Sequence, residues 1–332
     1  MSPGRKKKWF LACGVLPLLV LVLLPLSVRR VLLGPQGSYF DSAGVRIHYT
    51  DEGHGTPVLL VHGFANPAHL QWRRTGRIAA LSKEYRVIAL DNRGHGRSGK
   101  PRDPGQYGIQ MVEDLVRLLD HLKIQKAHVV GYSMGGFITL KMIATHPERI
   151  ISAAACGAGW ERATQENRDF AEAVARAVEK GEAGPLPKRL GIADRPLSFR
   201  EKLGVKLSLG YFNAPRALAA AVRGSRELTL TEEELRANRI PTLTIIGSQD
   251  GLLPDAKALH AQMANHELLI LEGKNHMNTD VSGAFVKALD DFLRKHTPEK
   301  ADSSPVMPPA AMPVPGPLAG KACAMRRPAR SE

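Results

Sequence analysis

Short apolar runs and amphipathic stretches alternate along the middle of the chain. The run PVLLVHGF (57–64) is apolar almost throughout, which is typical of a strand covered on both faces. The stretch MVEDLVRLLDHLK (111–123) instead spaces its apolar residues three and four apart, as an amphipathic helix does. This alternation predicts the α/β class, with a doubly wound, mostly parallel sheet between two layers of helices. Strands are expected at 45–50, 57–64, 85–91, 126–132, 149–156, 241–250 and 266–273, and helices at 111–123, 135–148, 255–264 and 283–295.

The alternation stops between Trp160 and Ile240. Helix-like runs at 171–180 and 231–239 are separated there by prolines and glycines. A structureless loop of this length is uncommon inside a compact domain, so we expect a helical cap inserted into the sheet domain. The predicted organisation is a cap over residues 160–240 and a core over residues 38–159 and 241–296. Three aromatic residues of the cap are expected to form its own core or to line a channel: Phe199, Tyr211 and Phe212.

The two ends of the chain differ from this middle part. Residues 9–28 read WFLACGVLPLLVLVLLPLSV without a charge, and about 20 apolar residues suffice to span a bilayer as a helix. Because basic residues and no small-residue cleavage site follow the run, we predict a membrane anchor over residues 1–30, with a cleaved signal peptide as the alternative. The basic cluster before the run favours a folded domain outside the cytoplasm, either anchored or secreted after cleavage. The tail, residues 297–332, is rich in proline and alanine and is predicted to be disordered.

The net charge of +14 is distributed unevenly along the 332 residues. Residues 1–30 contribute +6 and residues 297–332 contribute +2, which leaves 14 − 6 − 2 = +6 for the middle. No basic stripe is interleaved with aromatic residues, so we expect no nucleic-acid partner. The cysteines form no CxxC motif, so the sequence indicates neither a zinc site nor a disulfide framework: Cys13, Cys156 and Cys323.

One motif lies at the junction of a predicted strand and a predicted helix. Residues 131–135 read GYSMG and match G-x-S-x-G, the pattern of a nucleophilic serine on a tight strand-to-helix turn. Gly131 and Gly135 leave room for such a turn, which would lift the Ser133 hydroxyl above the carboxyl edge of the sheet. The N–H groups at the start of the following helix would favour negative charge at the same place. We therefore predict that Ser133 is a nucleophile rather than a small residue in a plain turn.

A serine hydroxyl needs a base to take its proton and a third group to orient that base. Asp250 ends one predicted strand, and His276 follows the last one. Both would therefore lie at carboxyl ends of strands, the edge at which doubly wound sheets bind their ligands. We predict that His276 is the base and Asp250 the acid, and we expect the nearby Asp280 to cap the last helix.

Acyl transfer also needs hydrogen-bond donors for the negative oxygen of its intermediate. One donor is expected to be the backbone N–H of Met134, directly after the serine. The other is expected to be the N–H of Phe64, in a loop that His62 and Gly63 support. The Phe64 side chain is equally expected to line a pocket or to serve in packing.

Several segments together resemble the α/β-hydrolase superfamily, in its capped branch with a Ser-Asp-His triad. The segments, within residues 40–296, are HGF at 62–64, DNRGHGRS at 91–98, GYSMGG at 131–136, SQDGLLP at 248–254 and NHMNTD at 275–280. The resemblance implies an eight-stranded sheet with the cap inserted between strands six and seven, and no cofactor or metal. It also implies that Ser133 is the nucleophile, Asp250 the acid and His276 the base.

Residues 94–99 read GHGRSG and match the G-x-G-x-x-G fingerprint of dinucleotide sites. That fingerprint opens a helix, whereas here Pro101, Pro104 and two further glycines follow. The resemblance explains the segment instead as a loop beside the active site. We therefore expect no bound nucleotide.

A serine nucleophile with this acid and base implies acyl transfer to water. We expect a small-molecule carboxylic ester, of lipid-like character if the domain faces a membrane, to be cleaved through an acyl-enzyme on Ser133. The acyl and alcohol parts and the oligomeric state stay open at this point. The resemblance also allows hydrolysis of carbon–carbon bonds in β-diketone-like substrates and a cofactor-free haloperoxidase or perhydrolase activity. A ligand-binding receptor with slow or no turnover is the alternative from another functional class.

Overall fold

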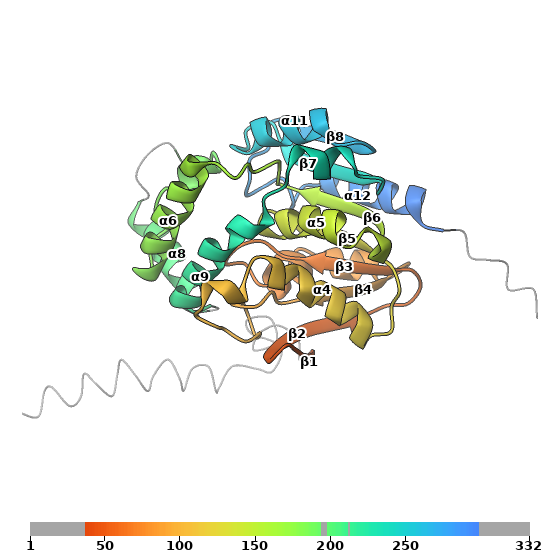
Figure 1. Ribbon diagram of the computed structural model, residues 1–332, viewed down its shortest axis with the longest axis horizontal. Helices are drawn as coiled ribbons and strands as arrows, with labels where there is room; N and C mark the ends of the chain where they lie inside the picture. Colours follow the sequence, from red (N-terminus) through yellow and green to blue (C-terminus); the bar gives the residue numbers. More distant parts are fainter. Residues whose placement is uncertain (1–36, 194–197, 212, 299–332) are drawn as a thin grey trace, which may run out of the picture. The chain divides into compact units, whose positions relative to one another are not determined.

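An eight-stranded sheet lies at the centre of the computed structural model, which describes residues 37–193, 198–211 and 213–298 (Figure 1). The strands follow the order β1-β2-β4-β3-β5-β6-β7-β8. Strand β2 is antiparallel to both of its neighbours, and all pairs from β4 to β8 are parallel, which confirms the predicted fold class. The strands are β1 (Ser38–Ser42), β2 (Val45–Glu52), β3 (Pro57–Val61), β4 (Arg86–Leu90), β5 (Ala127–Tyr132), β6 (Ile150–Cys156), β7 (Thr242–Gly247) and β8 (His266–Leu271).

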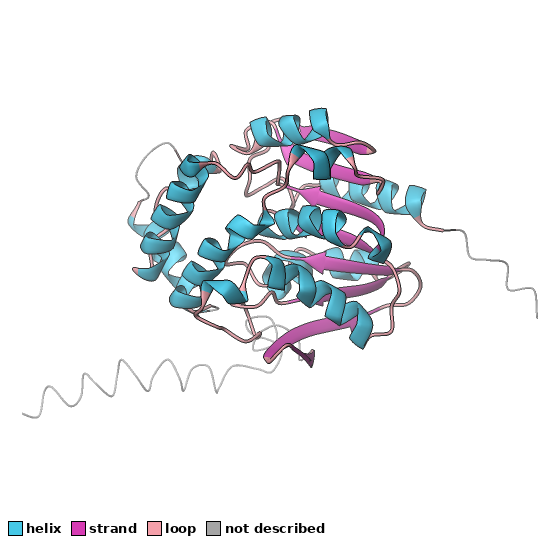
Figure 2. Ribbon diagram, in the orientation of Figure 1, coloured by secondary structure: helices cyan, strands magenta, loops and turns pink. Residues whose placement is uncertain are grey.

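Helices cover both faces of this sheet (Figure 2). In β3, Leu59 and Val61 belong to one apolar cluster, and the alternate residues Val58 and Leu60 belong to another. The first cluster includes residues of α4 (Ile109–His121), α5 (Met134–Thr145) and α11 (Leu253–Gln262), together with residues of the segment between β6 and β7. The second includes residues of α3 (Arg77–Leu81) and α12 (Gly283–His296). Central strands covered on both faces read as continuous apolar runs, which is the pattern in the sequence.

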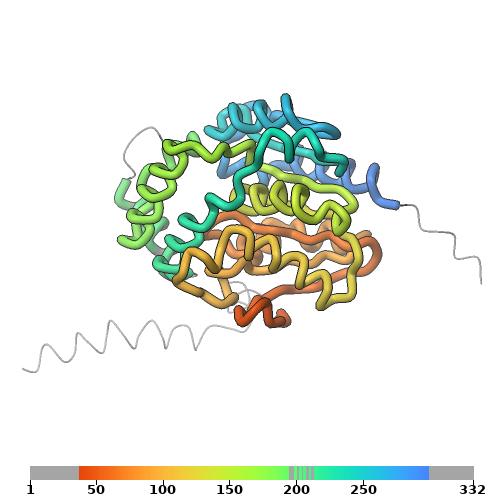
Figure 3. The backbone as a smooth tube through the Cα atoms, viewed as in Figure 1, coloured from red at the N-terminus to blue at the C-terminus, as the bar shows by residue number. Residues whose placement is uncertain are grey.

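The chain leaves the sheet after β6 and returns at β7, and the segment between them is helical, as expected for a cap (Figure 3). Its helices are α6 (Gln165–Glu179), α7 (Leu186–Arg189), α8 (Phe199–Tyr211), α9 (Pro215–Gly224) and α10 (Glu232–Arg236). Helices α6, α8 and α9 lie together at one end of the sheet (Figure 1). They share a small apolar cluster in which Val174 and Val178 of α6 meet Leu218 of α9.

Phe199 neither fills the cap nor lines a channel, in contrast to what we expected. Its side chain is 81% exposed, and Leu203, four residues on, is exposed beside it on the same face of α8. The inward positions of this helix carry Val205 and Leu209 instead. Phe212 and the side chain of Tyr211 lie outside the described residues.

Three further differences concern short elements. Strand β1 is not among the predicted strands, because its five residues show no long apolar run and lie at the edge of the sheet. Helix α3 and the π-helical turn η1 (His69–Arg73) are too short to show a helical period in the sequence. Strands β3 and β7 end at Val61 and Gly247, three residues before their predicted ends, since the following residues turn into loops at the carboxyl edge.

Strands β6 and β7 form the shortest pairing of the sheet, at the place where the cap is inserted. Their register is Ala153 with Thr242 and Ala154 with Leu243. By contrast, β7 pairs with β8 along its whole length, from Thr242 to Gly247. The last two strands are therefore joined to each other more extensively than to the rest of the sheet.

The predicted location, anchored in a membrane with the folded domain outside the cytoplasm, has to be corrected. No helix within residues 37–193, 198–211 and 213–298 is long and apolar enough to cross a bilayer. The longest helix in this part of the chain, α6, has 15 residues and charged side chains, whereas a span needs about 20 apolar residues. The predicted anchor, residues 1–30, and the predicted tail from residue 299 on lie outside the described residues.

Candidate active site

Ser133 lies on a sharp turn between β5 and α5. Its backbone angles, φ 55° and ψ −120°, are unusual for a residue with a side chain, and such conformations cost about 1–3 kcal/mol. The neighbouring glycines make the turn possible. A Cβ atom at Gly131 would lie 2.0 Å from the Gly135 carbonyl oxygen, and one at Gly135 would lie 2.1 Å from the Val61 carbonyl oxygen. The G-x-S-x-G pattern is therefore a steric requirement of this turn, and the turn leaves the serine side chain on the wall of a cavity.

The three residues predicted as a triad are joined in series by hydrogen bonds. His276 Nε2 lies 2.9 Å from Ser133 Oγ, and His276 Nδ1 lies 2.8 Å from Asp250 Oδ2. The other carboxylate oxygen, Asp250 Oδ1, accepts the N–H of Leu252 at 3.0 Å. Because a carboxylate only accepts, the proton on the ring is fixed at Nδ1, and Nε2 is left to accept the serine proton. This is the arrangement that a general base for Ser133 requires.

The loop that carries His276 is held by Tyr132, the residue directly before the serine. The Tyr132 hydroxyl donates to the His276 carbonyl at 2.7 Å, and the two ring centroids are 5.5 Å apart. Burial raises the pKa of Tyr132 well above its ordinary value, and the nearby carboxylates of Asp280 and Asp250 act in the same direction. The phenol therefore keeps its proton and remains a donor. This contact links the serine turn and the histidine loop.

The predicted oxyanion loop is ordered by a neutral histidine. His62 Nε2 accepts the N–H of Asn92 at 2.9 Å, so its proton lies on Nδ1, which donates to the Gly63 carbonyl at 2.7 Å. Burial lowers the pKa of His62 and keeps the ring neutral. In a trans peptide the C=O and the next N–H point in opposite directions, so the Phe64 N–H points away from His62. In the described part of the chain, neither this N–H nor that of Met134 has a hydrogen-bond acceptor.

Two residues that the sequence did not indicate as site residues complete this loop. Gln71, in the turn η1, accepts the Gly63 N–H on its Oε1 at 2.7 Å and donates from Nε2 to Asp280 Oδ2 at 3.3 Å. Asp280 is buried and is not the helix cap that we expected. The cap of α12 is Ser282, whose hydroxyl accepts the N–H of Phe285 at 3.2 Å. Nothing in the sequence marks Gln71, because its partners are eight and 209 positions away.

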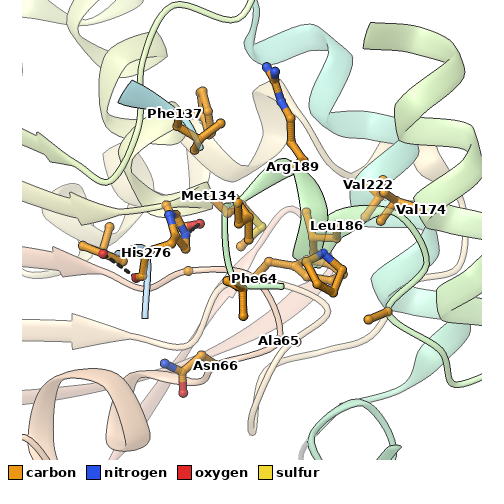
Figure 4. Close-up of a pocket in the computed structure, with 18 of the residues that line it drawn as sticks. Phe64, Ala65, Asn66, Met134, Phe137, Val174, Leu186, Arg189, Val222 and His276 are labelled. Atoms are coloured by element: carbon orange, nitrogen blue, oxygen red, sulfur yellow. Dashed lines mark hydrogen bonds between the residues drawn. The ribbon is translucent and has the colours of Figure 1, made fainter. Parts of the chain in front are cut away.

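A cavity of about 680 Å³ opens beside Ser133 and extends beneath the cap. This volume is within the usual range of small-molecule sites, about 300–1,000 Å³. Figure 4 shows His276 on one side of the cavity and cap side chains on the opposite side. The walls are mainly apolar, with Phe64, Met134 and Phe137 from the core and Val174, Leu186 and Val222 from the cap.

Charged side chains form one polar part of the cavity wall. Arg189 Nη2 pairs with Asp255 Oδ2 at 2.7 Å, and Glu161 lies in the same wall. Burial raises the pKa of Glu161, Arg189 opposes the rise, and Asp255 adds to it. These residues provide polar contacts in an otherwise apolar cavity.

The glycine-rich loop at 94–99 does not open a helix, since a short 3₁₀ turn, Pro104–Gln106, follows it and α4 begins at Ile109. His95 and Ser98 of this loop are buried, and Arg93, directly before the loop, is paired with the buried Asp114. Within the described ranges, no group of three or more histidines, cysteines or acids is placed to hold a metal ion.

Comparisons with known proteins agree with this fold. The family model described as alpha/beta hydrolase fold matches residues 56–188. The chain is 32% identical over 279 residues to a 2-hydroxymuconate semialdehyde hydrolase of Pseudomonas sp. (strain CF600), an alignment that covers 77% of this chain and 93% of that protein. It is 33% identical over 249 residues to the dihydrolipoyllysine-residue acetyltransferase component of an acetoin cleaving system of Pseudomonas putida, covering 73% of this chain and 64% of that protein. The chain thus spans slightly less than two thirds of the length of this second relative.

Solved structures give the same result. The enol-lactonase from Burkholderia xenovorans LB400 superposes with a TM-score of 0.62 at 25% identity, over 77% of this chain and 100% of that one. Together with the sheet order and the serine turn, these similarities leave one assignment. The chain belongs to the α/β-hydrolase superfamily.

Proposed function

We propose that this protein is a serine hydrolase that cleaves carboxylic esters through an acyl-enzyme on Ser133. The observation that carries the proposal is the series of hydrogen bonds from Asp250 through His276 to Ser133, on the wall of a cavity of small-molecule size. The solved enol-lactonase supports an ester substrate, since an enol-lactone is a cyclic ester.

In the first half of the reaction, Ser133 Oγ attacks the ester carbonyl carbon while His276 Nε2 takes the hydroxyl proton. The carbonyl oxygen becomes negative and receives hydrogen bonds from the N–H groups of Phe64 and Met134. The Asp250 carboxylate stabilises the imidazolium through the proton on Nδ1. When the intermediate collapses, His276 returns its proton to the leaving alcohol, and the acyl group remains on Ser133.

In the second half, His276 takes a proton from water, and the hydroxide attacks the acyl-enzyme carbonyl. The same two N–H groups hold the second oxyanion. Collapse releases the carboxylic acid and restores the Ser133 hydroxyl with the proton from His276. The cycle uses water and this chain's own groups, and the proposal includes no cofactor.

The cavity indicates the kind of ester. Its mainly apolar walls favour an apolar acyl or alcohol group, and the wall formed by Glu161, Arg189 and Asp255 offers contacts to a polar part of the substrate. Hydrolysis of a carbon–carbon bond in a β-diketone-like substrate is the second candidate. It is favoured by the 2-hydroxymuconate semialdehyde hydrolase, which aligns over 93% of its own length.

The test combines an active-site probe with a substrate panel. A fluorophosphonate should label the wild-type protein and not Ser133→Ala, because the label attaches to an activated serine. Esters of increasing acyl length should be hydrolysed up to a length set by the cavity and then poorly. Equal labelling of both proteins would show that Ser133 is not the nucleophile. Labelling without ester turnover would favour the carbon–carbon hydrolase, which a β-diketone-like substrate would then reveal, or a receptor with slow turnover.

A further inference from the structure

The loop before Phe64 is held by an unusual number of side chains. The carbonyl of His62 accepts from Asn92 Nδ2 at 3.0 Å, and the carbonyl of Gly63 accepts from His62 Nδ1 at 2.7 Å. The intervening N–H, that of Gly63, donates to Gln71 Oε1 at 2.7 Å. Among the residues that the structure describes, all polar groups of the peptides on either side of Gly63 therefore have partners, apart from the Phe64 N–H.

The orientation of the Gln71 amide is fixed by chemistry. An N–H can be accepted by the amide oxygen and not by the amide nitrogen, so Oε1 must face Gly63 and Nε2 must face Asp280. The side chain is buried, and its backbone is held at both ends: the Gln71 N–H donates to the Pro67 carbonyl at 3.1 Å, and its carbonyl accepts from Arg77 Nη1 at 3.3 Å. Gln71 thus forms a fixed bridge from the loop at 62–64 to Asp280.

Asp280 lies four residues after His276, so this bridge joins the two loops that meet at Ser133. We propose that Gln71 is a positioning residue for the oxyanion hole: it holds the Gly63 peptide, and through it the Phe64 N–H, in register with the loop of His276. Gln71 also lines the cavity, but in this role it acts through the Gly63 peptide and not on the reacting atoms. The inference rests on the proposed hydrolase function and adds a residue to it.

The expected loss of kcat follows from the geometry of the oxyanion hole. The hydrogen bonds of an oxyanion hole stabilise charge that develops in the transition state, so a small displacement of the donor lowers the rate without weakening binding of the ground state. A displacement of about 1 Å at a reacting centre costs up to about 100-fold in rate. Loss of the Gln71 bridge should therefore lower kcat about 10- to 100-fold and leave KM nearly unchanged.

The surroundings of Asp280 decide which substitutions are informative. Burial raises the pKa of Asp280, and Arg77, the Gln71 amide and His276 oppose the rise. Two further groups near this carboxylate, Tyr132 and Cys156, are buried and carry pKa values raised by burial, so they stay neutral. The charged or titratable groups facing Asp280 are therefore Arg77 and His276.

Four variants separate a positioning role from simple packing. Gln71→Met keeps the size of the side chain and removes both hydrogen bonds. In Gln71→Glu the new side chain still accepts the Gly63 N–H, but it places a second carboxyl group against Asp280. The two carboxyl groups must share a proton, and they repel each other once that proton is lost. The double variant Gln71→Glu with Asp280→Asn reverses donor and acceptor and restores the bridge without a shared proton. Asp280→Asn alone keeps an oxygen for Gln71 Nε2.

The experiment measures kcat and KM on the best ester of the panel, with affinities for a trifluoromethyl ketone, which mimics the oxyanion, and for the product carboxylate. We expect Gln71→Met to lose kcat and ketone affinity by similar factors, with product affinity unchanged. The rate of Gln71→Glu relative to wild type should fall as pH rises, and the double variant should remain close to wild type at every pH.

Three results would count against the inference. An unchanged kcat in Gln71→Met would overturn it, and so would equal losses of ketone and product affinity, which indicate general damage to the fold. A double variant no better than Gln71→Glu would do the same. The wild-type protein separates this outcome from failure of the proposed function: if it neither binds the fluorophosphonate nor hydrolyses esters, the function and the inference fall together.

Discussion

Replacement of Asp250 by asparagine tests the proton positions that the hydrogen bonds imply. Asp250 Oδ1 accepts the Leu252 N–H at 3.0 Å, and Oδ2 faces His276 Nδ1 at 2.8 Å. In Asp250→Asn the amide oxygen must take the first position, because only an oxygen can accept the Leu252 N–H. The amide nitrogen is then left to donate to His276 Nδ1. The ring must carry its proton on Nε2, which faces Ser133 and can no longer accept from it.

The loss of the base sets the size of the effect. The same substitution in the triad of a serine protease lowers kcat about 10⁴-fold through the wrong tautomer. We expect a similar decrease here, which corresponds to about 5 kcal/mol in the activation free energy. The substitution is nearly isosteric at a buried position, so the protein should remain folded and should bind the product carboxylate as before.

The assay is kcat on the best ester, together with the rate of fluorophosphonate labelling and the thermal midpoint. Asp280→Asn is the matched control, since it neutralises a second buried carboxylate close to His276 without facing either ring nitrogen through a hydrogen bond. The tautomer argument would be refuted if Asp250→Asn kept kcat within about tenfold of wild type, or if both asparagine variants lost the same factor.

Two other predictions concern stability. Tyr132→Phe removes the hydroxyl that donates to the His276 carbonyl at 2.7 Å, and an unsatisfied buried carbonyl costs about 1–3 kcal/mol, so the urea midpoint should fall; an unchanged midpoint would mean that another donor replaces the phenol. Burial lowers the pKa of His128 from 6.5 to about 4, and His296 adds to the effect, so the unfolded state binds more protons between these values. Stability from this residue is full above pH 6.5 and is lost as pH falls toward 4, by roughly 2 kcal/mol at pH 5. Between pH 7.5 and pH 5, the free energy of unfolding in urea should decrease less for His128→Gln than for wild type. An equal decrease in both proteins would contradict the role assigned to His128.

The parts of the site that the sequence predicts are those governed by local rules. The turn at Ser133 needs small residues two positions away on each side, and Gly131 and Gly135 supply them. Asp250 and His276 stand just after the carboxyl ends of strands, and parallel strands bring such ends to one edge. Local patterns were therefore enough to place all three side chains in one neighbourhood.

The parts that the sequence did not predict depend on packing between distant segments. The partners of Gln71 depend on how the five-residue turn η1 packs against the loop of His276. Asp280 was expected to cap α12 because it precedes that helix, but Ser282 is closer to the first turn and has the shorter reach to its N–H groups. Phe199 is exposed because α8 packs with Val205 and Leu209 facing inward. The sequence of α8 is only weakly amphipathic, so it does not show which face is buried.

The short pairing of β6 with β7 has a consequence for how the site is divided. Ser133 follows β5 on one side of this junction, whereas Asp250 and His276 follow β7 and β8 on the other. The 2.9 Å contact between Ser133 and His276 therefore crosses the junction of β6 with β7, which Gly157 N–H extends by donating to the Ile245 carbonyl at 2.9 Å, while the acid–base pair lies entirely on one side of it. If β7 and β8 moved together away from β6, the hydrogen bond between Ser133 and His276 would break. Asp250 would still hold His276 in the correct orientation. Turnover therefore depends on the alignment of β5 and β6 with β7 and β8, as well as on the orientation of the acid–base pair.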